Sequence, residues 1–413
     1  MRVLWLSSVR LTDEKTLLSG TWLPGLLSLL KTHYPDLVII NLTKGLVSQP
    51  IKVENELLCE WLIPTTDRMT TKATQQINDI IKQENPEIIQ VWGTEDIWGM
   101  YPFYKQHTHI PVILEIQGIL ASVSEEFYGG LTPIELLKCW NIKETLKPSS
   151  SLPAIRRLYS RHVSREEQIL RSFSNIGIQS AWSASVVRTV NRTARLFESG
   201  IALRPAFYKS RKWEYSNGSS VRVFSTAFMG QPLKGAYTLF KAFAIVRQQF
   251  PNAQLVIAGA NEYGVRRSGF CRMLIKFAKK HKFWNSVHQL GPLSADQLAE
   301  QYRIASVFVN PSNCESYSVV TAEAMYLGCP TVASYVGAMP ELGIEGSVLY
   351  FPKGDSRICA SLIIKILENK DLALGMSRKS ILIGETRQNC DRIAQMQMDT
   401  YLRLLGQIDK TRC

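Results

Sequence analysis

Two glutamates, Glu315 and Glu323, lie eight positions apart in a segment that runs from an apolar stretch to a Gly-Cys-Pro break. The stretch VFVNPS is typical of a strand ending at its carboxyl edge, and VVTAEAMYL is typical of a short helix that Gly328 and Pro330 end. The residues NCESYS between them predict a polar loop. We therefore expect Glu315 at the mouth of a sheet and Glu323 inside the helix that follows.

This arrangement suits a sugar linked to a diphosphate. A helix that begins near Ser318 presents unpaired backbone N–H groups and a partial positive charge, which attract a diphosphate. A carboxylate just before the helix accepts hydrogen bonds from sugar hydroxyls, and one deeper in the helix suits the adjacent hydroxyls of a ribose. The alternative is that Glu315 only caps the helix and Glu323 lies on the surface. The spacing alone does not decide between the two.

Short apolar stretches alternate with longer amphipathic ones in both halves of the chain, which is the pattern of parallel α/β sheets. The predicted strands are residues 3–6, 37–42, 88–92 and 112–116 in the first half, and 221–226, 254–259, 287–291, 307–311, 330–334 and 348–351 in the second. The clearest helices are residues 20–35, 235–250 and 294–305. The fold class is therefore α/β with two doubly wound, Rossmann-like domains, whose ligands bind at the carboxyl ends of the strands.

The domain boundary is predicted in a polar stretch, YKSRKWEYSNGSS, which has no apolar period. We expect an N-terminal domain over residues 1–207, a linker over 208–220 and a C-terminal domain over 221–385. A last helix within residues 386–413 is expected to pack back on the N-terminal domain. Because the chain contains no G-x-G, a dinucleotide oxidoreductase is only a minor alternative.

Composition narrows the functional classes. The chain has 413 residues and a formal net charge of +13, which favours an anionic partner. Without an RNA-binding or zinc-finger signature, nucleic acid is not expected as that partner. Eight scattered cysteines without a C-x-x-C pair predict reduced thiols and a cytoplasmic protein. The histidines show no metal-ligand spacing, and no apolar stretch is long enough to span a membrane.

The segment PSNCESYSVVTAEAMYLGCPTVASYVGAMPEL resembles the signature of the retaining nucleotide-sugar glycosyltransferases of family four, which have the GT-B fold. The matching positions keep their register throughout and are Pro311, Ser312, Glu315, Ser316, Tyr317, Ser318, Glu323, Ala324, Met325, Gly328, Pro330, Ser334, Gly337, Pro340 and Glu341. Upstream, PLKGAYTLFKAF resembles the family's Lys-Gly turn and helix. The resemblance covers the second domain almost completely and the first weakly, and it is closest to bacterial capsular and cell-surface polysaccharide enzymes.

The resemblance implies two domains facing a cleft, with the acceptor on the first and the nucleotide sugar on the second. Glu315 and Lys234 are then the catalytic residues: Glu315 contacts hydroxyls of the transferred sugar, and Lys234 neutralises the leaving phosphate. The implied donor-binding residues are Glu323, which holds the ribose, with Ser316, Tyr317, Ser318, Val319, Val320, Gly230 and Gly259. No cofactor or metal is implied, and the donor is a nucleotide-diphosphate sugar, with uridine as the expected nucleoside.

Two positions depart from the family pattern. Met229 stands where the family commonly has an arginine five residues before its lysine, and Gln117 stands where it has a histidine near the acceptor. Arg222 or Lys241 is a candidate to replace the missing cation. Glutamine can orient a sugar hydroxyl but cannot exchange a proton near neutral pH.

The acceptor side is predicted from few residues. Gln117, Thr94 and Glu95 follow strand ends in the first domain, where Thr94, Glu95 and the adjacent Asp96 either bind acceptor hydroxyls or cap the next helix. The segment 117–147 is apolar and basic. Its side chains Leu131, Ile134, Leu136, Leu137 and Trp140 either pack a flap or dip into a bilayer.

The expected acceptor is a glycan or a lipid-linked oligosaccharide in surface polysaccharide biosynthesis, with an anionic membrane surface as a further partner on the cytoplasmic side. Two alternatives remain for the function. One is a nucleotide-sugar epimerase or phosphorylase of the same fold. The other is a non-catalytic protein that binds a sugar nucleotide.

Overall fold

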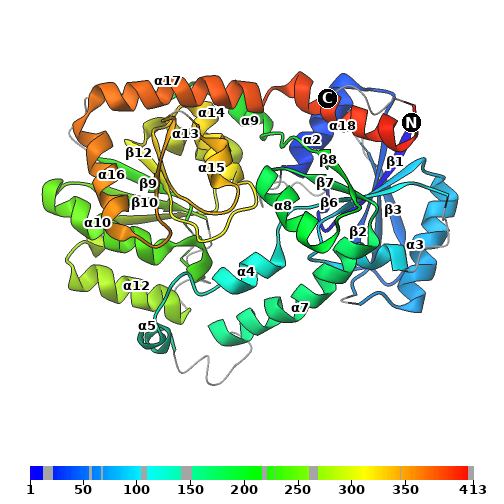
Figure 1. The fold of residues 1–413 in the computed structure, drawn as a ribbon, viewed down its shortest axis with the longest axis horizontal. Helices are drawn as coiled ribbons and strands as arrows, with labels where there is room; N and C mark the ends of the chain where they lie inside the picture. The colour runs from blue at the N-terminus through cyan, green and yellow to red at the C-terminus, as the bar shows by residue number, and fades with distance from the viewer. Residues whose placement is uncertain are drawn as a thin grey trace. The chain divides into compact units, whose positions relative to one another are not determined.

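Two compact units make up the chain in a computed structural model that describes residues 1–12, 22–54, 58–66, 68–103, 109–140, 151–215, 221–227, 229–259, 268–344 and 346–407. Figure 1 shows the elements of both units. The N-terminal unit consists of Met1–Leu120, Arg161–Arg204 and Gln388–Cys413, and the C-terminal unit of Ala121–Ser160 and Pro205–Arg387. Each unit contains its own sheet.

Residues 121–160 differ from the predicted boundaries, which placed them in the N-terminal domain. In the structure they belong to the C-terminal unit because their contacts are made there. Glu126 forms an ion pair with Lys353, and the Cys139 sulfur lies 3.7 Å from that of Met273. Residues 121–160, which the chain inserts between two segments of the N-terminal unit, are therefore part of the C-terminal unit.

The predicted linker differs as well. Trp213 is buried, its indole N–H donates to the carbonyl of Ala305 (2.7 Å), and its amide donates to the carbonyl of Leu327 (2.7 Å). The Lys212 ammonium donates to the carbonyl of Tyr326 (2.8 Å). These residues are therefore an integral part of the C-terminal unit, and residues 216–220 of the predicted linker lie outside the described residues.

The sheet of the N-terminal unit has the strand order β3-β4-β2-β1-β5-β6-β7-β8 among the described residues. Only β3 is antiparallel to its neighbour. The strands are β1 (Arg2–Leu6), β2 (Val38–Gly45), β3 (Ile51–Glu54), β4 (Cys59–Pro64), β5 (Ile88–Trp92), β6 (Val112–Glu115), β7 (Asn175–Ile178) and β8 (Arg195–Glu198). The helices of this unit are α2 (Leu23–His33), α3 (Thr71–Glu84), η1 (Ile97–Phe103), α8 (Ala181–Val190) and α18 (Cys390–Leu404).

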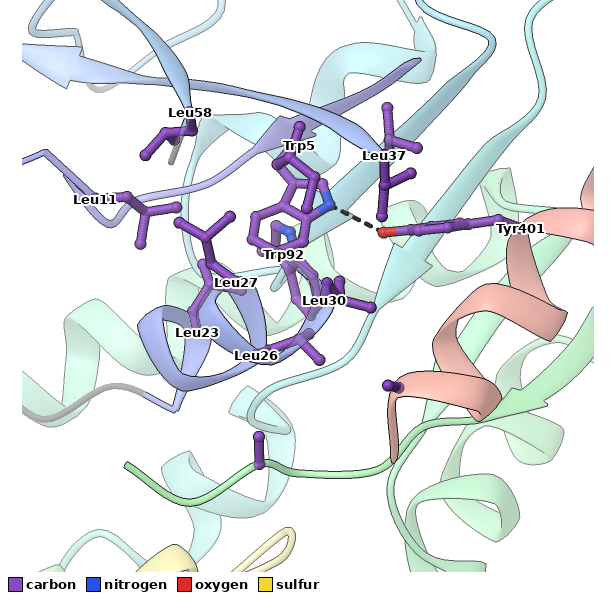
Figure 2. Packing of buried hydrophobic residues seen from close by; sticks show 14 of the residues in the cluster. Trp5, Leu11, Leu23, Leu26, Leu27, Leu30, Leu37, Leu58, Trp92 and Tyr401 are labelled. Carbon is purple, nitrogen blue, oxygen red and sulfur yellow. Dashed lines mark hydrogen bonds between the residues drawn. The ribbon is translucent and has the colours of Figure 1, made fainter. Parts of the chain in front are cut away.

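The last helix, α18, contributes to the core of the N-terminal unit. Trp5 of β1 and Trp92 of β5 meet edge to face with ring centroids 5.2 Å apart, among leucines of α2 (Figure 2). The Trp5 indole N–H donates to the hydroxyl of Tyr401 (3.0 Å), which in turn donates to Gln90 Oε1 (2.6 Å). An unpaired indole N–H or hydroxyl in this core would lower the stability of the unit, so the hydrogen bond between Trp5 and Tyr401 stabilises it.

The sheet of the C-terminal unit is parallel, with the order β11-β10-β9-β12-β13-β14. The strands are β9 (Arg222–Ser225), β10 (Gln254–Ala258), β11 (Val287–Gly291), β12 (Val307–Asn310), β13 (Thr331–Ser334) and β14 (Val348–Phe351). Helix α10 packs on α12 and α16, and α14 packs on α17 (Figure 1). The helices are α9 (Pro205–Lys209), η3 (Pro232–Lys234), α10 (Ala236–Gln249), α12 (Gly269–Lys280), η4 (Trp284–Ser286), α13 (Ala295–Ile304), α14 (Val319–Leu327), α15 (Met339–Leu342), α16 (Ser356–Glu368) and α17 (Lys370–Arg387).

Three helices belong to the insertion or border it: α4 (Leu120–Glu126), α5 (Pro133–Lys138) and α7 (Leu152–Ser172). No helix in the described part of the chain is long and apolar enough to cross a membrane. None of the seven cysteines in the described ranges forms a disulfide.

The doubly wound α/β prediction is confirmed. Strands β5, β11 and β14 and helix α14 begin and end at the predicted residues. Strands β3, β4, β7 and β8 were not predicted. Each has a short or broken apolar pattern. IKVE carries charges at alternate positions, and RLFE carries a charge at each end. NIGI contains a glycine, and CEWLIP contains a buried Glu60 and a proline.

Candidate active site

The site is built where β9 and β12 end side by side. After β9 the chain makes the turn η3, which ends at Lys234 and Gly235. Gly235 has a left-handed backbone (φ +71°), and a Cβ there would lie 1.8 Å from the carbonyl oxygen of Pro311. Only glycine permits this approach. The Lys-Gly turn is thereby pressed against the loop that follows β12.

Asn313 connects the two loops through several hydrogen bonds. Its amide side chain donates to the carbonyls of Pro232 (3.2 Å) and Leu233 (3.1 Å), and its backbone N–H also donates to Leu233 (2.9 Å). On the other side, the amide of Ala338 donates to the carbonyl of Glu315 (2.9 Å). The backbone that carries Glu315 is therefore fixed from both directions.

Lys234 and Glu315 form an ion pair at this position. The ammonium nitrogen lies 2.8 Å from Glu315 Oε1, and the side chains are 42% and 12% exposed. Desolvation lowers the pKa of Lys234, but the charge of Glu315 and the hydrogen bond to it outweigh that effect, so the pKa lies above its ordinary value. Lys234 is therefore cationic at neutral pH and accessible to an anionic ligand.

Helix α14 begins next to this pair without a side-chain cap. Its N-cap residue, Ser318, has φ +81° and ψ +78°, which is a strained backbone for a residue other than glycine. Its hydroxyl accepts from the Asn310 amide (2.9 Å) and donates to Thr321 Oγ1 (3.0 Å). Since the hydroxyl is used in this way, it does not cap the helix, and the first turn keeps its capacity to bind an anion.

The remaining predicted donor residues surround α14 or lie on neighbouring strand ends. Glu323 is 1% exposed, and Tyr302 Oη lies 3.4 Å from its Oε2. This burial excludes the alternative of a surface glutamate. Tyr317 and Ser318 are buried, whereas Ser316, Val319, Val320 and Gly230 are half-buried. Gly259 is exposed after β10, and its amide donates to the carbonyl of Gly291 (2.9 Å).

Met229 occupies the position of the missing arginine as a buried side chain, with the Gln289 amide nitrogen 3.2 Å from its sulfur. The two candidate replacements lie elsewhere. Arg222 is at the amino end of β9 and bonds Gln301, so the suggestion that it substitutes is wrong because it lies at the opposite end of the strand. Lys241 lies 4.4 Å from the centre of the Tyr237 ring.

The three acceptor-side residues lie at the carboxyl edge of the N-terminal sheet. The hydroxyl of Thr94 is buried and donates to Glu166 Oε1 (2.8 Å), which also accepts from the amide of Leu120 (2.9 Å). Glu95 is exposed and accepts from the amide of Gly118 (3.1 Å), directly after the half-buried Gln117. Glu95 and Gln117 are thus accessible, while Thr94 holds Glu166 in place.

An ion pair at the same edge was not predicted. The Lys44 ammonium lies 2.6 Å from Asp96 Oδ1, and the Ser8 hydroxyl donates to Asp96 Oδ2 (2.7 Å). Desolvation raises the pKa of Asp96, but the bonds from Lys44, the Ile97 amide and Ser8 bring it below its ordinary value. Only the position of Asp96 after a strand end marked it in the sequence. Among the described residues, no three His, Cys, Asp or Glu side chains gather as metal ligands would.

Comparison with known proteins agrees with this geometry. Residues 222–382, which lie in the C-terminal unit, match the family described as glycosyl transferases group 1. D-inositol 3-phosphate glycosyltransferases are among the curated relatives. The one from Pseudarthrobacter chlorophenolicus is 34% identical over 144 residues, which are 34% of this chain and 33% of that protein. The one from Mycolicibacterium gilvum is 34% identical over 137 residues, 32% of this chain and 29% of that protein.

The chain thus spans about a third of the length of the curated relatives it matches. Solved structures match over nearly the whole chain. Sucrose-phosphate synthase from Thermosynechococcus elongatus has a TM-score of 0.73 at 16% identity and covers 98% of this chain and 99% of its own. Anabaena HepE in complex with UDP and glucose has a TM-score of 0.66 at 15% identity, covering 98% and 99%. The fold is therefore GT-B.

Proposed function

We propose that this protein transfers a sugar from a nucleotide-diphosphate sugar to an acceptor hydroxyl, with retention of configuration and without a metal. The observation that carries the proposal is the Lys234–Glu315 ion pair, set beside the uncapped start of α14. A cation and a helix N-terminus can bind a diphosphate, and a carboxylate can accept hydrogen bonds from sugar hydroxyls. The match of residues 222–382 to the group 1 glycosyl transferases supports it.

In the proposed reaction, the bond between the anomeric carbon and the diphosphate oxygen breaks while the acceptor oxygen bonds that carbon on the same face. The acceptor's proton passes to the departing phosphate oxygen, so no protein nucleophile is required. Lys234 and the first amides of α14 stabilise the charge that develops on the diphosphate. Glu315 orients the sugar hydroxyls, and Glu323 accepts from the ribose. UDP is the proposed leaving group, supported by the HepE structures with UDP and with UDP-glucose.

Nucleotide binding tests this proposal directly. UDP added at a hundred times its dissociation constant should stabilise the native protein by about 2.7 kcal/mol and raise the melting temperature, because it binds only the folded site. A thermal-shift panel of UDP, GDP, UDP-glucose and NAD is the measurement. A response to NAD equal to that to UDP, or no response to any nucleoside diphosphate, would contradict a sugar-nucleotide site.

For the acceptor, we propose a glycan or a lipid-linked oligosaccharide of surface polysaccharide biosynthesis. The curated relatives favour a second candidate, a phosphorylated small acceptor, since they are D-inositol 3-phosphate glycosyltransferases. Product analysis also separates the other functions. An epimerase or phosphorylase releases product without a sugar acceptor, whereas a non-catalytic binding protein releases none at all.

Helix α5 supports the proposal of an anionic membrane as a further partner on the cytoplasmic side. Ile134, Leu137 and Trp140 are 66%, 74% and 50% exposed and recur every three residues, while Leu131 is buried and Leu136 is half-buried. Leu136, Leu137 and Trp140 line an apolar pocket of about 400 Å³. Helix α12, which packs on α5, adds the exposed lysines Lys276, Lys279 and Lys280. Apolar side chains beside lysines suit an anionic lipid surface.

Replacing Leu137 by serine should reduce binding to vesicles that contain anionic phosphatidylglycerol several-fold, because a side chain that inserts into the lipid is removed. Flotation of the full chain at low and high salt measures the bound fraction. The matched control is Leu382→Ser, which removes a leucine that is 69% exposed on α17. Equal binding of L137S and wild type, or no binding of wild type at low salt, would remove this proposal.

A further inference from the structure

A second ion pair lies at the carboxyl edge of the C-terminal sheet. The Lys353 ammonium, two residues after β14, is 2.5 Å from Glu126 Oε1 at the end of α4. The two side chains are 43% and 30% exposed, so both are accessible to a ligand. The family resemblance assigns no role to either residue.

The backbone connects this pair to the Lys234–Glu315 pair. Gly129 follows Glu126 by three positions, and a Cβ on Gly129 would lie 2.5 Å from the carbonyl oxygen of Pro232 and 2.8 Å from the Asn313 amide nitrogen. Pro232 begins the turn that ends at Lys234, and Asn313 belongs to the loop of Glu315. The segment after α4 therefore lies against both loops of the donor site.

The charges of both pairs act on a single buried thiol. Burial raises the pKa of Cys314, the neighbour of Glu315, to about 12. This raised pKa also includes the effects of four charges: Glu315 and Glu126 raise it, whereas Lys234 and Lys353 lower it. Since all four charges act on Cys314, the two ion pairs lie in one region of the C-terminal unit.

The strand order fixes the side of the site on which the second pair lies. Across the sheet, Gly259 follows β10, Lys234 follows β9, Glu315 follows β12 and Lys353 follows β14. With the leaving phosphate at Lys234 and the transferred sugar at Glu315, Gly259 lies on one side of the reaction centre. Lys353 lies on the other, beyond the sugar.

We propose that Glu126 and Lys353 form a sugar-selecting pair, which binds hydroxyls at the far end of a neutral donor sugar and excludes sugars that carry a carboxylate. This inference rests on the proposed function. An ammonium donates to a hydroxyl oxygen and a carboxylate accepts from the hydroxyl hydrogen, so the pair together satisfies a neutral sugar. A uronic acid would instead place its carboxylate beside that of Glu126, and like charges repel.

The test compares UDP-glucose with UDP-glucuronate, which differ only in a carboxylate at carbon 6. Glu126→Gln leaves Lys353 without its counter-charge, so the ratio of the two dissociation constants should shift tenfold or more in favour of UDP-glucuronate. Lys353→Gln should shift the same ratio in the opposite direction. Calorimetric titration of the full chain gives both constants. The control is Glu368→Gln, which removes an exposed carboxylate at the end of α16 and should leave the ratio unchanged.

Titration with UDP alone keeps this inference distinct from the proposed function. UDP should bind wild type, E126Q and K353Q within about twofold of one another, because UDP lacks the sugar. If UDP binds but the ratio for the two sugars is unchanged in E126Q, the selecting pair is overturned and the donor site stands. A purely structural loosening by E126Q would weaken both donors equally and would also overturn it. If UDP does not bind wild type, the proposed function itself fails.

Discussion

Replacing Lys234 by alanine should lower the turnover number about a hundredfold, which corresponds to about 3 kcal/mol of lost transition-state stabilisation. The ammonium lies 2.8 Å from Glu315 Oε1 in the structure, with its pKa raised by that contact. In the proposed reaction it acts on the charge that develops as the diphosphate departs. Met229 is uncharged and stands where the family commonly has an arginine. We therefore expect Lys234 to provide most of the positive charge that stabilises the leaving phosphate.

Initial rates with a saturating nucleotide sugar measure this effect, together with circular dichroism and the melting temperature to establish that the fold is intact. Lys234→Arg should recover part of the rate because it restores a cation. Lys365→Ala, which removes an exposed lysine from α16, should change nothing. A turnover number for K234A within threefold of wild type would mean that the leaving phosphate is not stabilised at this position.

Replacing Glu115 by glutamine should stabilise the protein at pH 8 by up to about 3 kcal/mol. Glu115 ends β6 and is 1% exposed. Burial raises its pKa to about 7, although hydrogen bonds from Ser199 and Gln90 oppose the rise. Within the described residues its Oε1 has no hydrogen-bond partner. The shift from the ordinary value of 4.5 to about 7 corresponds to about 3 kcal/mol of stability that depends on protonation.

The direction with pH follows from the raised pKa. The folded state holds the proton more tightly than the unfolded state, so the stabilising contribution is fully present below pH 4.5. It is lost as the pH rises through about 7. Urea unfolding at several pH values should therefore show E115Q and wild type nearly equal at pH 4.5 and diverging up to pH 8. Glu198→Gln, an exposed change on β8, should follow wild type, and a constant E115Q difference at every pH would contradict a titrating Glu115.

The fold was predictable where hydrophobic periodicity is strong. Fully buried parallel strands such as IIQVW are nearly continuous apolar stretches in the sequence, and both sheets were predicted from such stretches. The edge strands β3 and β8 carry charged residues because one side faces water. Their hydrophobic pattern is therefore too weak to distinguish them from polar loops in the sequence. The transfer of residues 121–160 to the C-terminal unit depends on contacts distant in sequence, such as that between Glu126 and Lys353, and no local pattern encodes these.

The candidate site was predictable to a similar extent. Lys234 and Glu315, 81 positions apart, were both singled out by the family resemblance, and the structure brings them into one ion pair. The role of Thr94 was left open, and in the structure its hydroxyl donates a hydrogen bond to Glu166. Glu166 lies in a basic helix, and nothing in the sequence distinguishes it from the other charged residues there. Lys44 and Asp96 were not paired in the prediction because their contact depends on the order of the strands.

Because α18 belongs to the N-terminal unit, the order in which the two units fold during translation is affected. Tyr401 bonds Trp5, which is made 396 residues earlier, and completes the core around it. Residues 205–387, the larger part of the C-terminal unit, leave the ribosome before Tyr401 does. We therefore expect the core around Trp5 to be completed only after α18 has been made, which is later than residues 205–387 of the C-terminal unit.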